Sequence, residues 1–363
     1  MRASGLAALA GLLLVVSACS GVELDAAARA EEAPPSSLTP LSADTTAARA
    51  ATTTAPPTTT SPPETTTTAA PKGRLVISGV GDTNLDPGYI PAFQAEGYEY
   101  AFSGLQDIFL DDDLTIVNLE CAATTLGAPV KELFNFNCDI AALPIAREAG
   151  VEVANLANNH GADYGEEALL DTKANVEAAG IEPVGVGRTV AEATRPALFE
   201  INGWKIAVIG FGGVVPWPDW VATEDDAGMA SGDDIELMAR VVADAAQLAD
   251  LVVVTVHWGV ELDLQPRQED IERANAMVEA GADIIFGHHP HRLQPLELID
   301  GKPVAWSLGN FIWPRLSSAG SKTAIAQAIV APDGTITACL IPVDIESSGH
   351  PVVQVDYRGN CEW

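Results

Sequence analysis

Three histidines stand within four residues at positions 287–291 (sequence GHHPH), and they make up half of the six histidines in the chain. The segment follows residues 283–286, an apolar run that indicates a buried strand. Imidazole is the commonest metal ligand among side chains, and Pro290 stiffens the link between His289 and His291. A rigid His-x-His segment at a strand end predicts a metal or phosphate site. The alternative is a surface loop that happens to carry histidines.

The same arrangement, an apolar strand followed directly by polar side chains, occurs at four other places. Those places carry Asp82 and Asn84; Asn118 and Glu120; Asn158, Asn159 and His160; and His257. Ligand sites in α/β sheets gather beyond the carboxyl ends of strands, so five such ends predict one shared site. Carboxylate, amide and imidazole groups together suit zinc, manganese or iron better than calcium or magnesium. We therefore expect one or two divalent transition metals as cofactors.

Each of these residues also has a purely structural interpretation. Asp82 could cap a helix, and Glu120 could be a solvated carboxylate on a loop. Asn158 and Asn159 could be turn residues, and His257 could be a hydrogen-bonded histidine of the core. Because all of them share one position at the end of a strand, a common site explains them better than five separate structural roles.

The elements that must position these residues alternate between strands and helices, which predicts an α/β domain with a largely parallel sheet. The helical patterns cover residues 91–109, 141–149, 165–179, 233–248 and 267–280. The strand-like runs are residues 75–80, 114–117, 151–154, 181–186, 197–201, 205–211, 251–256 and 283–286. Three late alternating runs, at 324–330, 336–342 and 352–357, predict antiparallel strands in a mixed or second sheet.

The first residues of the chain resemble a targeting signal. Arg2 precedes an apolar run over residues 6–16, which is too short to span a bilayer and is typical of a signal peptide. The run leads to Val-Ser-Ala-Cys at 16–19, which resembles a bacterial lipobox and implies lipid attachment to Cys19; the alternative is an ordinary secretory signal. We predict a lipoprotein signal peptide over residues 1–18, and an extracytoplasmic protein anchored to the membrane.

The segment that follows has almost no large apolar side chains. Its Thr, Pro, Ala and Ser residues cannot bury enough surface to offset the entropy of ordering, so residues 19–73 are predicted to form a disordered tether. The folded domain is expected over residues 74–345, with a C-terminal tail over 346–363. The formal net charge of −31 disfavours nucleic acid as a partner and disfavours unaided binding of a polyanion.

Four cysteines remain besides Cys19. An even number in an exported chain predicts disulfides, and four cysteines allow three pairings. We favour Cys121–Cys138 and Cys339–Cys361, which are nearest in sequence, and the second pair would hold the C-terminal tail. A zinc site at these cysteines is the weaker alternative, because no C-x-x-C spacing occurs.

Six motifs together resemble the bacterial capsule synthesis CapA family, which is associated with synthesis and export of poly-γ-glutamate. The motifs are GDTNL at 81–85, NLE at 118–120, ANNH at 157–160, HWGVE at 257–261, GHHPH at 287–291 and SLGNF at 307–311. The resemblance covers roughly residues 74–343 and extends to the calcineurin-like metallophosphoesterases. It implies a four-layer αββα sandwich, metallophosphatase-like, with mixed sheets and a dinuclear metal site at the strand ends.

The resemblance also implies a role for each matching residue. Those that match metal ligands are Asp82, Glu120, Asn159, His257, His289 and His291, and His160 matches the acid that protonates the leaving group. Two motifs depart from the pattern: Asn84 stands where the usual Asp-x-His motif has histidine, and Glu120 stands where an aspartate is usual. Residues expected to support the ligands or contact the substrate are Asn84, Asn118, Asn158, Trp258, Glu261, His288 and Asn310.

Two functions compete on this basis. The first is a metal-dependent hydrolase with His160 as general acid, which acts on a phosphoester or γ-glutamyl amide of a capsule or wall polymer. The second is a non-catalytic lipoprotein that binds an anionic envelope polymer at the same metal-lined cleft and passes it through the envelope. A polymer synthase complex is a candidate partner in both. A transporter-linked solute-binding lipoprotein fits the anchor but does not explain five ligand-bearing strand ends.

Overall fold

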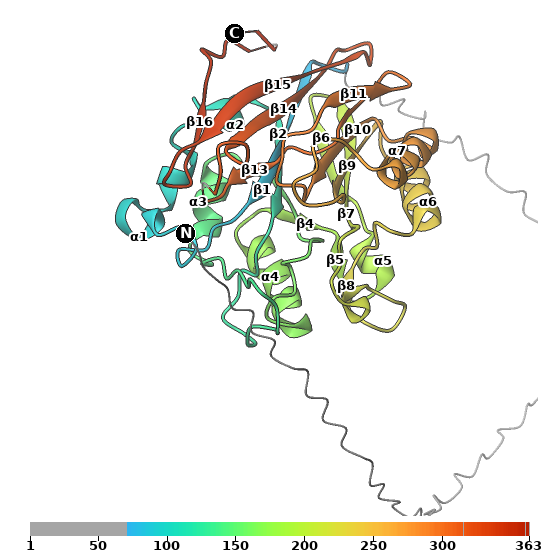
Figure 1. Ribbon diagram of the computed structural model, residues 1–363. Helices are drawn as coiled ribbons and strands as arrows, with labels where there is room; N and C mark the ends of the chain where they lie inside the picture. The colour runs from blue at the N-terminus through green and yellow to red at the C-terminus, as the bar shows by residue number, and fades with distance from the viewer. Residues whose placement is uncertain (1–70, 315, 360, 363) are drawn as a thin grey trace, which may run out of the picture. The chain divides into compact units, whose positions relative to one another are not determined.

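The computed structural model describes residues 71–314, 316–359, 361 and 362 (Figure 1). The predicted signal peptide, the lipidation site at Cys19 and the tether up to residue 70 lie outside the described residues. Within the described part of the chain, no helix is long and apolar enough to cross a membrane.

The first sheet has eight strands and is built around β1 (Leu75–Thr83). Its strand order is β16-β15-β14-β1-β2-β3-β4, and β13 (Asn310–Ile312) pairs with the end of β1. β1, β2 (Leu114–Leu119), β3 (Val153–Asn155) and β4 (Glu182–Val184) run parallel. The antiparallel strands β14 (Lys322–Val330), β15 (Ile336–Ile345) and β16 (Pro351–Val353) complete the sheet, so the sheet is mixed and includes residues of the predicted tail.

The second sheet has six strands in the order β11-β12-β10-β9-β7-β6. Its parallel centre is β7 (Trp204–Gly212), β9 (Leu251–His257), β10 (Ile284–His288) and β12 (Lys302–Ala305). The antiparallel edges are β6 (Ala197–Ile201) and β11 (Leu296–Ile299). The unbroken apolar runs fall on β7, β9 and β10 because central parallel strands are buried on both faces. A separate two-stranded sheet pairs β5 (Val186–Gly187) with β8 (Gly228–Met229).

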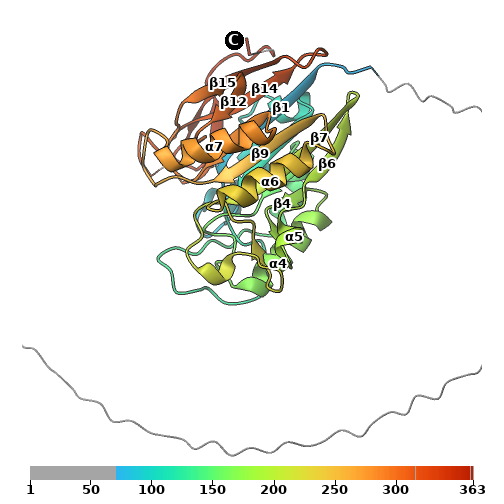
Figure 2. The same ribbon diagram turned by 90° about the vertical axis from the view of Figure 1, so that its right-hand side faces the viewer.

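The two sheets pack face to face, and helices cover the outer face of each (Figures 1 and 2). Ile77 of β1 and Phe286 of β10 belong to the core between the sheets. The outer layer of the first sheet contains α1 (Ala92–Glu96), α2 (Ile108–Asp111), α3 (Ala142–Glu148) and α4 (Glu166–Ala178). The outer layer of the second sheet contains α6 (Ile235–Ala245) and α7 (Gln268–Ala280). The predicted four-layer αββα sandwich with mixed sheets is therefore confirmed.

Short elements are where the structure differs from the sequence-based expectations. The helical pattern at 91–109 becomes α1, a 3₁₀ turn η1 (Tyr98–Phe102) and α2, because Gly97 adopts a φ of 85° and ends α1. The run at 181–186 divides into β4 and β5 at Gly185, whose φ is 87°. The elements that sequence patterns did not predict are β8, β11, β12, β13, α5 (Val190–Ala193) and η2 (Pro218–Trp220). Each of them is too short to show a periodicity.

Both predicted disulfides are present in the structure. Cys121 and Cys138 are joined with Cα atoms 5.7 Å apart, which links the end of β2 to the segment before α3. Cys339 and Cys361 are joined at the same Cα separation of 5.7 Å, which links β15 to the C-terminal segment. Because disulfides form and persist in oxidising compartments, the two bonds support a location outside the cytoplasm.

Candidate metal centre

The carboxyl ends of strands from both sheets meet at one place, as the strand-end pattern predicts. Asn118 at the end of β2 donates a hydrogen bond to Asp82 of β1 (3.0 Å). The same amide nitrogen lies 3.1 Å from Nδ1 of His257 at the end of β9. The backbone N–H of His289, just beyond β10, lies 3.4 Å from Asp82 Oδ1. Residues more than 200 positions apart in the chain thus surround the Asp82 carboxylate.

Asp82, Glu120 and His291 form the core of this centre. Each offers one ligand atom, and these atoms all lie within 4.8 Å of one another. His291 Nδ1 is 2.9 Å from Asp82 Oδ2, and His291 Nε2 is 3.8 Å from Glu120 Oε1. Both carboxylates are completely buried. Such a set of carboxylate and imidazole groups can hold a divalent transition metal.

Several polar atoms at the centre have no hydrogen-bond partner. They include Glu120 Oε1, His289 Nδ1 and His291 Nδ1, all of which are buried. Although His291 Nδ1 lies close to the Asp82 carboxylate, the contact lacks the geometry of a hydrogen bond. Buried polar atoms without partners are rare in folded proteins because each costs desolvation free energy. All three are lone-pair donors, so the residues present fit a bound cation.

The electrostatics of the centre also suit a cation. Burial, with the charge of Asp82 beside it, raises the pKa of Glu120 well above its usual range. Burial acts against the charged form of Asp82 too, but close contact with His291 and the charges of nearby histidines hold its pKa below the usual value. Burial lowers the pKa of His257 well below its usual value and that of His289 to about 4. Both rings are therefore neutral near pH 7, which is the state in which imidazole ligates metals.

Asn159 and His257 pair directly beside the core of the centre. Asn159 Oδ1 lies 2.7 Å from His257 Nε2, and His257 Nδ1 lies 3.9 Å from Asp82 Oδ1. The ring centroids of His257 and His289 are 4.8 Å apart. The structure thus brings together all six residues that the resemblance marks as metal ligands.

The backbone around the histidine cluster is strained in a way that concentrates at functional sites. His289 has a φ of 94° and His291 a φ of 52°, although side-chain-bearing residues rarely adopt positive φ. Such conformations persist only where the surrounding structure enforces them. Here they place the His291 ring against the carboxylates of Asp82 and Glu120, and the His289 ring with its centroid 5.8 Å from that of His291.

His160 forms a second polar group together with Asp163. His160 Nδ1 lies 2.9 Å from Asp163 Oδ2, and that oxygen also accepts a hydrogen bond from the backbone of Phe136 (2.7 Å). The Phe136 ring packs against His160 at a centroid distance of 4.3 Å. Burial raises the pKa of Asp163. With Nδ1 held by Asp163, Nε2 is the nitrogen left to carry a proton to a reacting group.

Sequence reasoning did not identify Asp163, Phe136 or Glu132. Glu132, His160 and Asp163 also offer ligand-type atoms within 4.8 Å of one another. The only signal for Asp163 was its place three residues after His160 in the same turn. Glu132 and Phe136 lie on a loop without periodicity, and nothing in their sequence context links them to His160.

Three of the predicted supporting residues lie in different surroundings. Trp258 is buried in the outer core of the second sheet and donates a hydrogen bond to the carbonyl oxygen of Trp306 (2.9 Å), so it packs away from the centre. Glu261 is exposed on the segment after β9. His288 is buried within the sheet, with Nε2 2.9 Å from Thr255 Oγ1.

Asn84 occupies the position at which the family resemblance leads one to expect a histidine ligand. Its Oδ1 accepts a hydrogen bond from the backbone N–H of Asp86 (2.8 Å), while its buried Nδ2 has no partner. That arrangement fixes which end of the amide is oxygen and leaves only N–H groups free. The end of the Asn84 amide that lacks a partner is therefore its nitrogen, which has no lone pair for a cation.

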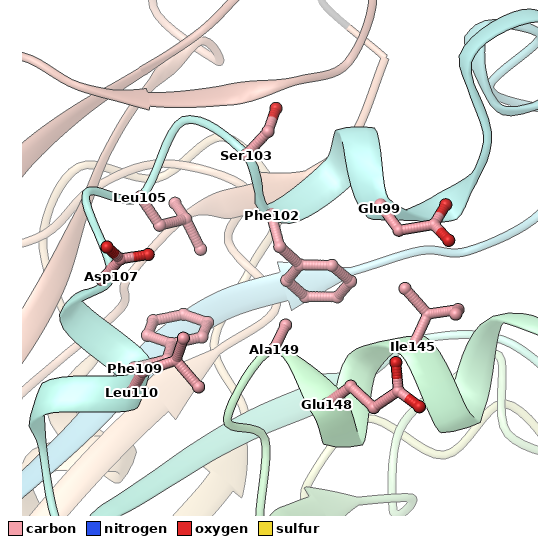
Figure 3. Close-up of a pocket in the computed structure, with 10 residues that line it drawn as sticks. All are labelled: Glu99, Phe102, Ser103, Leu105, Asp107, Phe109, Leu110, Ile145, Glu148 and Ala149. Carbon is pink, nitrogen blue, oxygen red and sulfur yellow. The ribbon is translucent and has the colours of Figure 1, made fainter.

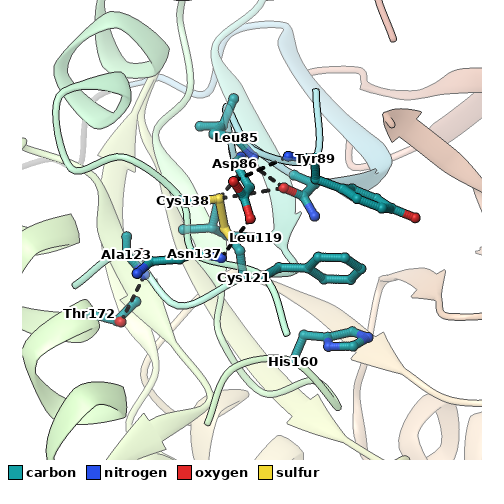
Figure 4. The surroundings of a disulfide bond; sticks show 12 residues. Leu85, Asp86, Tyr89, Leu119, Cys121, Ala123, Asn137, Cys138, His160 and Thr172 are labelled. Atoms are coloured by element: carbon teal, nitrogen blue, oxygen red, sulfur yellow. Dashed lines mark hydrogen bonds between the residues drawn. A yellow bond between two sulfur atoms is a disulfide. The ribbon is translucent and has the colours of Figure 1, made fainter. Parts of the chain in front are cut away.

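The Cys121–Cys138 disulfide lies beside the candidate metal centre (Figure 4). Cys121 directly follows Glu120, and its partner Cys138 accepts a hydrogen bond from the backbone N–H of Leu85 (2.8 Å) through its sulfur. Cys138 Sγ also lies 3.9 Å from Asn84 Oδ1. The bond therefore connects the segment after β2 with the segment after β1, both of which carry residues of the centre.

Pockets also lie away from the centre, and one of them is shown in Figure 3. It has a volume of about 250 Å³ and is formed by η1, α2 and α3 and the turns between them. Phe102 extends into it, and the carboxylates at its edge come from Glu99, Asp107 and Glu148 (Figure 3). No histidine or cysteine lines it, so it offers neither the ligand set nor the proton-transfer group found at the strand ends.

Fold and centre together define a class, namely a four-layer αββα sandwich with candidate metal ligands at the carboxyl ends of its strands. The sequence matches the family described as bacterial capsule synthesis protein PGA_cap over residues 76–315. This match covers more than half of the chain, so the chain belongs to that family.

Curated relatives agree with this membership. The chain is 30% identical over 286 residues to the PGA biosynthesis protein CapA of Bacillus subtilis. This alignment covers 78% of this chain and 74% of the relative. It is 29% identical over 286 residues to the capsule biosynthesis protein CapA of Bacillus anthracis, which covers 77% of this chain and 70% of the relative.

A solved structure of Haemophilus influenzae NAD nucleotidase overlaps with the chain at a TM-score of 0.43 and 14% identity. The overlap covers 78% of this chain and 54% of that one. The chain spans about half the length of the solved structures that it matches.

Proposed function

We propose that this protein is an exported metal-dependent hydrolase that acts in the synthesis, release or export of a capsule or wall polymer such as poly-γ-glutamate. The observation that supports the proposal most directly is the cluster of Asp82, Glu120 and His291, whose ligand atoms lie within 4.8 Å of one another. The biological setting is supported by the family and by the named roles of the relatives in capsule and PGA biosynthesis.

The residues of this centre have separate roles in the proposed hydrolysis. Asp82, Glu120, Asn159, His257, His289 and His291 would hold one or two divalent ions of manganese, zinc or iron. Such ions lower the pKa of bound water and stabilise negative charge on the attacked group. His160, oriented by Asp163 at 2.9 Å, delivers a proton from Nε2 to the leaving group. The bond attacked would be a phosphoester or a γ-glutamyl amide.

A non-catalytic role is the second candidate, and the state of Asn84 favours it. The side chain that stands at an expected ligand position offers only unpaired N–H groups, which weakens the first metal site. In this alternative the residues of the centre would hold a cation that offsets the negative charge of the protein, and the protein would bind an anionic polymer there and pass it on without cleaving it. A net charge of −31 disfavours unaided binding of a polyanion, and a bound cation would reduce that repulsion.

Metal analysis of the purified protein, wild type beside His291→Ala, tests both candidates. We expect about one to two equivalents of a transition metal in the wild type and a clear loss in the variant. Hydrolysis of a nitrophenyl phosphodiester or of poly-γ-glutamate that depends on the metal and on His160 would establish the hydrolase. Polymer binding by a metal-loaded but inactive wild type would establish the alternative, and a folded wild type without metal would contradict both.

The proposal also includes a lipid anchor at Cys19, a tether over residues 19–73 and a polymer synthase complex as partner. It is supported by the lipobox-like sequence and by the disulfides, which indicate an oxidising compartment. Replacement of Cys19 by Ser should move the protein from the membrane fraction to the soluble exported fraction. Retention of Cys19→Ser in the membrane fraction would contradict the anchor.

A further inference from the structure

We propose that Asn310 is itself a metal ligand, supplying its side-chain oxygen to the cation at Asp82 in place of the histidine that Asn84 does not provide. This inference rests on the proposed metal centre and adds a residue to it. Asn310 lies on β13, a strand of three residues that sequence patterns did not predict.

Strand register places Asn310 beside Asp82. In the parallel pairing of β1 with β13, Asp82 is the register partner of Asn310, and in the pairing of β1 with β2 it is the partner of Asn118. Register partners on neighbouring strands lie about 5 Å apart, and the register of β1 with β13 shifts only after Asp82. Asn310, Asp82 and Asn118 therefore form a row across three strands, and Asn118 already bonds to the Asp82 carboxylate.

The amide of Asn310 is oriented so that its oxygen is the free atom. Its Nδ2 donates a hydrogen bond to the carbonyl oxygen of Gly320 (3.2 Å), which fixes the amide orientation. Its Oδ1 is buried and has no partner. An unpartnered carboxamide oxygen on the register partner of a buried aspartate is a lone-pair donor that a divalent cation would satisfy.

Asn84 shows the opposite arrangement at the same end of β1. Its oxygen is engaged by Asp86 and its nitrogen is free, so a ligand position is lost there. Asn310 has its nitrogen engaged and its oxygen free. The two asparagines thus differ in which end of the amide lacks a partner, the nitrogen in Asn84 and the oxygen in Asn310.

Two glycines hold β13 close to the centre. The carbonyl oxygen of Gly309 accepts a hydrogen bond from the backbone N–H of Asp82 (2.8 Å), and a Cβ on Gly81 would lie 2.1 Å from that oxygen. A Cβ on Gly309 would lie 3.0 Å from the backbone nitrogen of Leu293, two residues after His291. Asn310 therefore lies between the strand that carries Asp82 and the segment that carries His291.

The test is titration of the full chain, freed of metal by a chelator, with Co²⁺ and Mn²⁺. Calorimetry gives affinity and stoichiometry, and the visible absorption of bound Co²⁺ reports its ligand set. We expect Asn310→Ala to weaken binding by about tenfold or more and to shift the Co²⁺ spectrum, by analogy with losses at supporting residues of metal sites. Asn310→Asp retains a ligand oxygen and should bind at least as tightly as the wild type.

Asn275→Ala is the matched control, because it removes an asparagine whose nitrogen also donates to a backbone carbonyl oxygen, that of Ile271, but which lies exposed on α7. It should leave the affinity and the Co²⁺ spectrum unchanged. Wild-type affinity and spectrum in Asn310→Ala would overturn the inference while leaving the proposed centre intact. Equal losses in Asn310→Ala and Asn310→Asp would also overturn it, since packing would then explain both. Absence of binding in the wild type would overturn the centre as well.

Discussion

At the scale of single residues, Asn118 holds the buried polar groups of the centre in a fixed arrangement. Its Nδ2 faces Asp82 Oδ1 (3.0 Å), Glu120 Oε2 (3.4 Å) and His257 Nδ1 (3.1 Å). Its Oδ1 accepts hydrogen bonds from the amides of Asn155 and Asn158, each at 3.3 Å. A neutral amide can serve both sides because it is a donor at one end and an acceptor at the other.

Replacement of Asn118 by Asp should destabilise the metal-free protein by about 2–4 kcal/mol. The carboxylate still accepts from Asn155 and Asn158, but it would face the buried carboxylates of Asp82 and Glu120 without a donor. Urea unfolding of chelator-treated protein measures the loss. Added Mn²⁺ should recover part of the stability, because a cation offsets the repulsion. Equal stability of the variant and the wild type without metal would contradict this role.

His288 makes the stability of the metal-free protein sensitive to acid. Burial lowers its pKa to about 4, whereas a histidine in the unfolded chain titrates near 6.5. As the pH falls from about 6.5 to 4, the unfolded chain binds a proton that the folded protein does not, so stability is lost over that window. The shift corresponds to a loss of up to about 3 kcal/mol.

The variant His288→Gln keeps a polar group for Thr255 and cannot titrate, so its unfolding free energy should fall less steeply between pH 7 and pH 4. Urea unfolding at pH 7, 5.5 and 4, with chelator present, compares the two proteins. His289, whose pKa is also about 4, contributes to the slope in both and therefore cancels in the difference. If the unfolding free energies of the two proteins fall equally steeply with pH, His288 does not cause the sensitivity to acid.

At the scale of elements, the centre depends on how closely the two sheets approach each other. Gly79 on β1 faces Phe286 on β10, and a Cβ at position 79 would lie 2.5 Å from atoms of the Phe286 ring. Gly79 precedes Asp82 by three residues, and Phe286 precedes His289 by three. The missing side chain therefore allows the strand ends to come near enough for the backbone of His289 to face the Asp82 carboxylate at 3.4 Å.

Gly79→Ala should destabilise the protein by about 1–3 kcal/mol, since an added methyl group in a packed core forces the sheets apart. It should also weaken metal binding, because the separation acts on Asp82 and His289 together. Gly73→Ala is the matched control, as its Cβ would lie 3.4 Å from the nearest atom, which is an ordinary contact. Thermal unfolding and Mn²⁺ titration measure the two effects. A loss of stability in Gly79→Ala with unchanged metal affinity would show that the packing at Gly79 does not position the residues of the centre.

At the scale of the whole described chain, two disulfides perform different tasks. Cys121–Cys138 spans 17 residues and borders Glu120, whereas Cys339–Cys361 spans 22 residues and fastens the C-terminal segment to β15. Closing loops of this length constrains the unfolded chain to a similar degree. The two bonds therefore differ in their distance from the centre more than in their contribution to stability.

Replacing either cysteine pair by serines should lower the unfolding free energy by about 2–4 kcal/mol. Only Cys121→Ser/Cys138→Ser should also weaken metal binding, because it frees the segment that carries Glu120. Cys339→Ser/Cys361→Ser serves as the matched control, because it also removes one disulfide. Chemical denaturation and Co²⁺ titration of both variants check the prediction, and equal metal affinities would refute a positioning role for the first bond.

Much of the candidate centre was predictable from the sequence because one local rule places its residues. Buried strands are apolar along their length, so a polar residue directly after such a run marks the strand end. Asp82, Glu120, Asn159, His257 and His289 all follow that rule. The αββα architecture came from the family resemblance of the motifs, and alternating patterns alone indicated only an α/β protein.

Tertiary structure alone decided which atoms face one another. Asp163, in the same turn as His160, and Phe136, on a loop, both contact the His160 ring. Asn310 is the register partner of Asp82 on β13, a strand too short to have a pattern. Trp258 belongs to a recognised motif yet packs into the outer core against Trp306. A sequence determines which side chains can do chemistry, because residue type and local burial pattern are local properties. Which side chains face one another depends on the strand register and on how closely the two sheets approach. Both are set only by the packing of the entire domain.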